Sequence, residues 1–212
     1  MTGTAPKTTR LSIFPLPGAL LFPRMHLPLH IFEPRYRAMV TDSLARDRRI
    51  AMIQPRPGAK TGPGEAPPLF DIGCVGRIAE VQALDNGRYD IVLEGLSRFR
   101  ILRELDVTTI FRQVEAELIT DPQDEVLALG ERAALELESR RFADAQGYAV
   151  DWEAVTRLDD ASLVNGIAQI APFDPAAKQA LLEADTLRDR AELTVQLMQF
   201  FGRHDSDEGT LQ

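Results

Sequence analysis

The chain has 212 residues, of which 44% are hydrophobic and 26% are charged, and its formal net charge is −8 at pH 7. This composition is ordinary for a globular protein. The sequence has no run of about 18 uninterrupted apolar residues, so it predicts no transmembrane helix. The acidic balance argues against non-specific binding to DNA.

The charge is divided unevenly along the chain. Residues 1–118 hold 16 Lys and Arg against 13 Asp and Glu, whereas residues 119–212 hold 8 against 19. A change of this size indicates two domains with a boundary near residues 120–122. The predicted organisation is a flexible tail at 1–10, a first domain at 11–119, a second domain at 120–203 and a flexible tail at 204–212.

Residues 11–36 read LSIFPLPGALLFPRMHLPLHIFEPRY and hold five prolines among large apolar side chains. A helix would not carry proline at this density, since an interior proline costs about 3 kcal/mol, and a proline-rich linker is normally polar. The segment therefore predicts short extended pieces that pass through a core. These are a strand at 11–14, apolar pieces at 20–22 and 27–32, and a helix that opens with Pro34. The prolines also break the apolar run that a signal peptide would need, so we expect a cytoplasmic protein.

The rest of the first domain has the period of β-strands. The predicted elements are a strand at 49–54, a flexible loop at 55–68, a long strand at 70–84, a return strand at 89–93, a strand around Phe99 and Ile101, and a last strand at 107–119. The apolar phase of the long strand slips between Gly73 and Gly76, which predicts a bulge or a sharp bend. Residues 85–87 (DNG) predict a hairpin turn because Asn and Gly accept positive φ, and Gly95 predicts a further turn.

After residue 121 the hydrophobic period becomes that of helices. The predicted helices are one at 125–142, one capped by Asp159 and Asp160, one begun by Asp174 and Pro175, and one begun by a capping box of Thr186 and Asp189. In the first helix, the predicted buried stripe is Val126, Leu129, Ala133 and Leu137. Four amphipathic helices with short joins predict a bundle. The fold class is therefore α+β, with a small closed or half-closed β-barrel followed by a helical bundle.

The sequence has no motif for nucleotide binding or nucleophilic catalysis. His26 and His30 lie near Glu33, but Pro28 prevents a shared helical face and four extended residues span about 13 Å, too far for one metal ion. Cys74 is the only cysteine, which excludes an intrachain disulfide and a cysteine-based zinc site; we expect it to pack as a small buried residue. We therefore expect no metal, no cofactor and no catalytic residue.

Arginines recur along the strands of the first domain, together with two phenylalanines. They are Arg88, Arg98, Arg100, Arg103 and Arg112, with Phe99 and Phe111. Basic and aromatic side chains on one face can bind single-stranded nucleic acid. Asp90, Glu94 and Glu104 are available as ion-pair partners for the same arginines, so a paired and solvated face is the competing interpretation.

The opening stretch LSIFPLPGALLFPRMHLPLHIFEPRYRAMV resembles the signature of the Lon protease N-terminal domain, also called the Lon substrate-binding domain. VGRIAEV, DNGRYDIVLEGLSRFRI and FDPAAKQALLEADTLRDR agree in order, so the resemblance covers roughly residues 10–202. It implies a PUA-like β-barrel followed by a helical bundle. Because nothing resembles the family's nucleotide motif or its Ser–Lys protease dyad, the chain resembles a stand-alone Lon N-terminal domain without protease activity.

The resemblance implies a non-catalytic module that binds unfolded or exposed protein segments, as an adaptor or regulator of proteolysis that partners a Lon-type protease, with no role at a membrane. The candidate peptide contacts are Phe22, His30, Phe32, Arg35, Tyr36, Arg98 and Phe99, because aromatic side chains supply contact area and arginine binds carboxylates. An RNA-binding PUA-like module is the alternative, and an enzyme with a small pocket between the barrel and the bundle is a third possibility to which no residue can be assigned. An uncharged apolar groove would favour protein binding, and a basic aromatic face would favour RNA.

Overall fold

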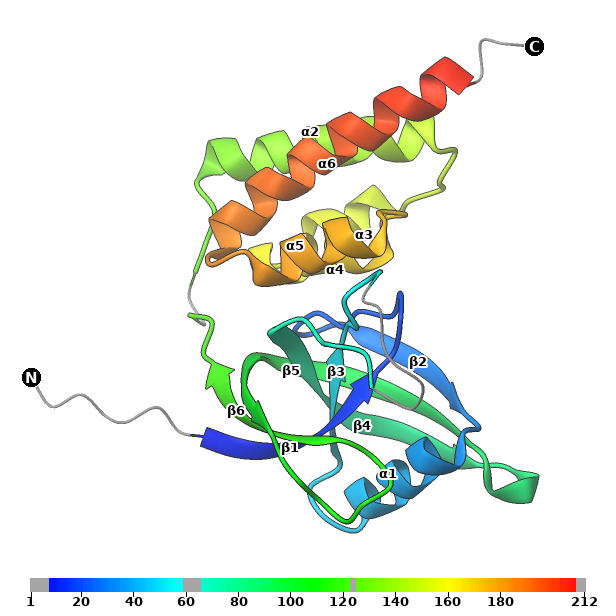
Figure 1. Cartoon of the computed structure of the whole chain (residues 1–212). Helices are drawn as coiled ribbons and strands as arrows, with labels where there is room; N and C mark the ends of the chain where they lie inside the picture. Colours follow the sequence, from blue (N-terminus) through cyan, green and yellow to red (C-terminus); the bar gives the residue numbers. More distant parts are fainter. Residues whose placement is uncertain (1–7, 59–65, 123–124, 209–212) are drawn as a thin grey trace, which may run out of the picture. The chain divides into compact units, whose positions relative to one another are not determined.

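The computed structural model describes residues 8–58, 66–122 and 125–208 (Figure 1). The chain divides into two compact units, Met1–Asp121 and Pro122–Gln212. Strands dominate the first unit and helices make up the second, so the fold class is α+β. The predicted tails at 1–7 and 209–212, and the central part of the predicted loop at 59–65, lie outside the described residues.

The first unit is built on one mixed β-sheet. Its strands are β1 (Thr8–Pro15), β2 (His26–Ile31), β3 (Arg49–Ile53), β4 (Ile72–Ala83), β5 (Tyr89–Glu104) and β6 (Gln113–Ile119). They lie in the order β2-β5-β4-β3-β1-β6, and β5 also pairs with β6. β1 runs parallel to β3, and the other pairs are antiparallel. β6, the last strand in this order, is therefore also hydrogen-bonded to β5, the second strand.

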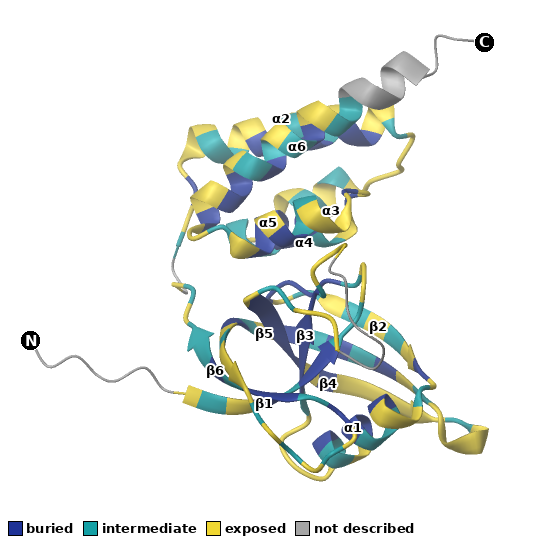
Figure 2. Ribbon diagram, in the orientation of Figure 1, coloured by how far each residue is buried: buried dark blue, intermediate teal, exposed yellow. Residues whose placement is uncertain are grey.

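The core of the first unit lies between strands that are distant in sequence. One buried cluster consists of Leu11, Ile13, Ala51, Ile53, Val75, Phe99, Val114 and Ala116. In β1, β3 and β6 its members alternate along the strand, as expected when one face of a sheet is covered. Figure 2 shows buried positions concentrated in β1, β3 and the neighbouring part of β4. Cys74 is among the buried residues, as the sequence predicted.

The proline-rich opening forms extended pieces and then a helix, as predicted. β1 begins at Thr8, so the predicted tail is too long: Thr8, Thr9 and Arg10 pair with β6. Residues 20–22 are buried but do not form a strand. Helix α1 (Pro34–Leu44) has its proline in the first turn, where the missing N–H has no partner to lose.

The hairpin and the bulge were predicted correctly, but the turn at Gly95 was not. A short 3₁₀ turn, η1 (Asp85–Gly87), joins β4 to β5, with φ of 73° at both Asn86 and Gly87. The register of β4 against β5 shifts between Val75 and Gly76. β5 continues through Gly95 as one strand of 16 residues. The strand predicted to start at residue 107 begins only at Gln113, where pairing with β1 starts.

Five helices are described in the second unit. They are α2 (Leu129–Ala145), α3 (Trp152–Thr156), α4 (Asp160–Ile170), α5 (Pro175–Glu183) and α6 (Leu187–Glu208). The sequence did not predict α3, which is a single short turn of helix. The predicted caps are confirmed: Asp159 and Asp174 accept from the backbone amides of Ser162 and Ala177. Because α6 reaches Glu208, the tail predicted from His204 is helical over most of its length.

The predicted buried stripe of α2 was wrong in phase. Leu129 and Leu137 are exposed, whereas Leu135, Ser139 and Phe142 are buried. Both sets have helical spacing, so the sequence alone allowed either face to be the covered one. None of the described helices is long and apolar enough to cross a membrane.

Candidate functional site

Two of the predicted contact residues belong to the core. Phe22 and Phe99 have no exposed surface. Phe99 packs inside the buried cluster of the first unit, and the backbone carbonyl of Phe22 lies close against Gly95 of β5. Tyr36 is also buried; its ring packs on Phe14 with centroids 4.0 Å apart, and its hydroxyl donates to the Pro15 carbonyl at 3.2 Å. Burial raises the pKa of the Tyr36 hydroxyl. These three residues shape the fold and are not available to a partner.

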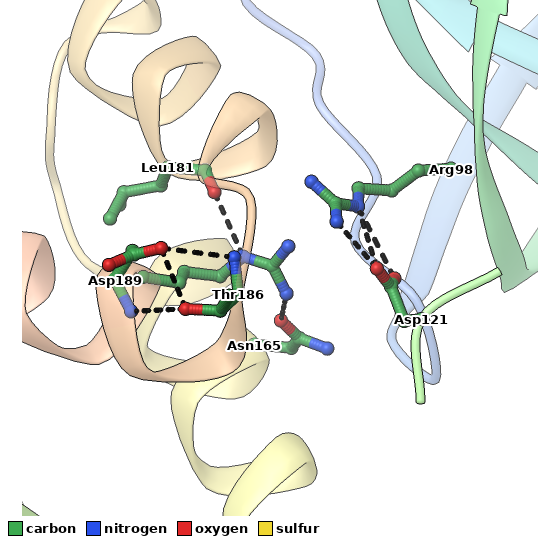
Figure 3. Close-up of polar contacts among 7 residues, drawn as sticks. Arg98, Asp121, Asn165, Leu181, Thr186 and Asp189 are labelled. Atoms are coloured by element: carbon green, nitrogen blue, oxygen red, sulfur yellow. Dashed lines mark hydrogen bonds and ion pairs between the residues drawn. The ribbon is translucent and has the colours of Figure 1, made fainter. Parts of the chain in front are cut away.

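Arg98 is the fourth predicted contact that the structure places inside. Its side chain is 3% exposed and its guanidinium binds Asp121, with Nη2–Oδ1 at 2.5 Å and Nε–Oδ1 at 3.1 Å (Figure 3). The sequence suggested Asp90, Glu94 or Glu104 as partners, but Asp121 occupies this role. Arg98 therefore fixes the end of the first unit and does not face a ligand.

The remaining predicted contacts lie on the surface of the first unit. Phe32 is 57% exposed, and its ring stacks on His30 with centroids 6.2 Å apart. His30 Nδ1 lies 2.6 Å from Asp90 Oδ1. Arg35 donates from Nε to Glu33 Oε2 at 2.9 Å and lies over the ring of Tyr36. Of the seven candidates, His30, Phe32 and Arg35 remain accessible.

A shallow hollow of about 390 Å³ adjoins His30 on the outer face of the sheet. It is lined by Pro28 and His30 of β2, Asp90 and Val92 of β5, and Glu80 and Gln82 of β4, among others. These side chains share a face because Pro28, Val92 and Glu80 are cross-strand neighbours, as are His30, Asp90 and Gln82. The hollow is open and its lining mixes polar and apolar residues, so the polar ones can offer hydrogen bonds to a chain that crosses it.

The arginines that suggested a nucleic-acid face are largely paired. Arg103 binds Glu115 at 2.7 Å, and Arg112 binds Glu104 through two donors at 2.7 Å each. The hydrogen bonds from Arg112 lower the pKa of Glu104. Phe99 and Phe111 are both buried, so neither can stack on a base.

A large apolar hollow lies within the helical unit. It encloses about 630 Å³ between α2, the segment 147–150, α3, α4 and α6. Its lining is almost wholly hydrocarbon: Phe142, Ala143, Tyr148, Val150, Trp152, Val155, Leu158, Leu163, Ile167, Ile170 and Met198 contribute, with Ser139 as a polar member. The Ser139 hydroxyl donates to the Leu135 carbonyl. Among the residues whose side chains the structure describes, no histidine, carboxylate or cysteine belongs to the lining.

Apolar side chains also surround the opening of this hollow. Ile170 is 80% exposed, and Tyr148 and Leu158 are exposed as well. Trp152 is held by Arg140, whose guanidinium lies 4.4 Å from the ring centroid, a contact that fixes one wall. A volume of this size and an apolar lining suit a large hydrophobic side chain or a short apolar segment.

The sequence pattern did not predict this apolar hollow. Its walls include α3 and the segment 147–150, both of which fell between predicted helices. The available signal was the succession of Tyr148, Val150, Trp152 and Val155, which is rich in large apolar residues for a join between helices. Within the described residues, no three His, Cys, Asp or Glu side chains gather closely enough to hold a metal ion.

Comparison with known sequences gives relatives along nearly the whole chain. Lon protease 2 of Sorangium cellulosum is 28% identical over 205 residues, which cover 93% of this chain and 25% of that protein. The Lon protease of Escherichia coli K12 is 25% identical over 198 residues, which cover 89% of this chain and 24% of that protein. The chain therefore spans about a quarter of the length of the curated relatives it matches.

Two solved structures share the fold. The Lon N-terminal domain protein from Xanthomonas campestris superposes with a TM-score of 0.68 at 20% identity, covering 89% of this chain and 98% of that one. The N-terminal domain of the Mycobacterium avium complex Lon protease gives 0.66 at 17% identity, covering 90% and 98%. A model of the ATP-dependent protease La (LON) substrate-binding domain matches residues 10–199. The chain therefore belongs to the family of LON substrate-binding domains.

Proposed function

We propose that this chain is a non-catalytic protein-binding module that recognises exposed apolar segments of unfolded proteins. The observation that carries the proposal is the hydrocarbon-lined hollow of about 630 Å³ in the helical unit. Burying one aliphatic side chain there would contribute about 1.5–3 kcal/mol. Ordering the unfolded partner opposes binding, so the affinity for a single segment is on the order of micromolar.

The finer assignments belong to the same proposal. We infer that the sheet whose pairings return to β5 is a PUA-like β-barrel and that the helices of the second unit form a bundle. The protein acts in the cytoplasm as an adaptor or regulator of proteolysis, with a Lon-type protease as its partner. Membership of a substrate-binding family and the Lon proteases among its relatives support this role. The hydrocarbon character of the described lining supports a binding role for the hollow.

The test is binding to a protein that cannot fold. Fluorescein-labelled, reduced and carboxymethylated α-lactalbumin is titrated with the whole chain, and anisotropy should show saturable binding. Ile170→Asn places a polar amide at the opening of the hollow and should weaken binding about tenfold, which corresponds to about 1.4 kcal/mol. Because Ile170 is 80% exposed, the substitution leaves the fold intact.

Leu129→Asn is the matched control. Leu129 is 90% exposed in the same unit but does not line the hollow, so its variant should bind like the wild type. Absence of saturable binding by the wild type, or equal binding by all three proteins, would refute the proposal. Retention of labelled poly(U) at low salt with loss at higher salt would favour the RNA alternative instead.

A further inference from the structure

The outer edge of β4 is open beyond Ile78. β5 pairs with β4 as far as Ala83, but β3 pairs with it only at residues 74–77. The last link on the β3 side is at Ile78, whose N–H donates to the Arg48 carbonyl at 2.8 Å and whose carbonyl accepts from Arg48 Nε at 3.1 Å. Among the described residues, the segment 79–83 has a strand beside it on one side alone.

The register shows which backbone groups face outward from this edge. The Leu84 N–H donates to the Arg88 carbonyl at 2.9 Å, and hydrogen-bonded pairs alternate in an antiparallel ladder. Gln82 and Glu80, opposite Asp90 and Val92, therefore direct their backbone groups toward β5. Val81 and Ala83 direct their N–H and C=O groups away from the sheet.

The opposite border of the sheet is blocked by a proline, whereas this one carries only the register shift between Ile78 and Glu80. On the β2 side of β5, the Gly95 N–H donates to the Met25 carbonyl, so the same alternation turns the backbone of Pro28 outward. Proline has no N–H to offer a further strand and is a common way to protect an edge. The segment 79–83 reads AEVQA and holds neither proline nor lysine. All five of its residues are exposed.

The side chains of the edge match an alternating partner. Val81 lies opposite the buried Ile91, yet it is 39% exposed because no strand covers it. On the other face, Glu80 and Asp90 both line the hollow of about 390 Å³. A strand added here would place apolar side chains next to Val81 and favour Lys or Arg next to the carboxylates.

We propose that the β4 edge at residues 79–83 binds an extended segment of an unfolded polypeptide as an additional β-strand. Main-chain hydrogen bonds to Val81 and Ala83 supply affinity that does not depend on sequence, and alternating apolar and basic side chains supply preference. A second copy of the chain is a poorer occupant, since five residues bury far less than the roughly 1,000 Å² that a stable interface needs. The partner is the class named by the proposed function, on which this inference rests, but the site is separate from the apolar hollow.

The test measures hydrogen exchange of single amides by NMR, with a ten-residue peptide that alternates valine and lysine as the probe. At saturation, the amides of Val81 and Ala83 should exchange at least tenfold more slowly. The amides of Glu80 and Gln82 already bind β5 and should change little. Unchanged exchange at Val81 and Ala83 would overturn the proposal.

Variants of both partners complete the experiment. Val81→Pro removes an outward N–H without breaking a bond to β5 and should weaken peptide binding at least tenfold, whereas Val81→Thr keeps the N–H and should bind normally. A peptide N-methylated at every second residue along one edge should also fail to bind, and this result does not depend on the stability of any variant. Equal binding of the methylated peptide would overturn the proposal.

The two proposals fail in distinguishable ways. If Ile170→Asn weakens binding of carboxymethylated α-lactalbumin but the peptide leaves Val81 and Ala83 unprotected, the edge proposal is wrong and the proposed function stands. If the wild type binds neither probe, both are wrong. Protection of Val81 and Ala83 that rises with protein concentration in the absence of peptide would identify a second copy as the occupant and overturn the edge proposal.

Discussion

Arg98 of β5 and Asp121, the last residue of the first unit, form an ion pair with Nη2–Oδ1 at 2.5 Å. The arginine side chain is almost fully buried, whereas the carboxylate is partly exposed. A buried guanidinium needs its counter-charge, because burial without a partner carries a large desolvation cost. The pair therefore anchors the chain where it leaves the sheet.

Asp121→Asn should destabilise the first unit. The amide keeps an acceptor oxygen but removes the negative charge of Asp121 from the buried guanidinium, and we expect a loss of about 1.5–3 kcal/mol in the free energy of unfolding. Urea denaturation followed by fluorescence and circular dichroism measures it. Asp71→Asn is the control, since Asp71 pairs with Arg56 on the surface, where such a pair contributes about 0–1 kcal/mol. Equal effects of the two substitutions would contradict the expectation.

Gly95→Ala should be poorly tolerated although Gly95 lies within a strand. A Cβ atom there would sit 2.0 Å from the Phe22 carbonyl oxygen, so the backbone itself must move. We expect a loss of about 1–3 kcal/mol or more, visible as a lower melting temperature. Gly130→Ala in α2 meets nothing within 4 Å and should stabilise the helix by up to about 1 kcal/mol. A Gly95→Ala variant as stable as the wild type would show that the backbones at Gly95 and Phe22 do not pack this closely.

Asn165→Ala should weaken the helical unit. The side-chain carbonyl of Asn165 accepts from Arg190 Nη1 at 2.8 Å, and Arg190 Nε donates to the Leu181 carbonyl at 2.9 Å (Figure 3). Both Asn165 and Arg190 are buried, so losing the acceptor should cost about 1.5–3 kcal/mol. Asn165→Asp keeps an acceptor and should lose less. Thermal unfolding separates the cases, and an alanine variant as stable as the wild type would argue against this account.

The Glu104–Arg112 pair should make stability depend on pH in the acid range. Hydrogen bonds from Arg112 lower the pKa of Glu104 in the folded state. The stabilisation is therefore complete above the ordinary pKa of a glutamate and is lost as pH falls through the lowered folded value. Because Glu104 is partly exposed, the effect is at most about 1 kcal/mol.

Melting curves of the wild type and Glu104→Gln between neutral and strongly acid pH measure this effect. The wild type should be the more stable protein at neutral pH, and the difference should vanish in acid. Asp106→Asn, at an exposed position nearby, should follow the wild type throughout. A difference that grows as pH falls would reverse the sign and refute the assignment.

The local features of the fold could be predicted from the sequence because they depend on a few adjacent residues. The turn at 85–87 follows from the positive φ that Asn86 and Gly87 accept. The caps at Asp159 and Asp174 follow from one side-chain oxygen and one nearby amide. The opening motif at residues 11–40 indicated the family, because a pattern of prolines and aromatics of this length is specific.

The predictions that failed concern which side of an element is covered. Leu129 and Leu135 both fit a helical stripe of α2, but only Leu135 is buried. Gly95 has the composition of a turn, yet it is required for a close approach to Phe22, a residue far away in sequence. In both cases the answer depends on a segment that the local pattern does not identify.

The sequence by itself determined most of the strands and helices, the turn at 85–87, the helix caps and the family, since these reside in contiguous residues. Only the tertiary structure decided that Phe22, Phe99 and Arg98 face inward while Phe32 stays exposed. It alone showed the apolar hollow and the open edge at residues 79–83. Burial, cavities and unpaired edges are set by which distant segments pack together, and that pairing is a property of the folded chain as a whole.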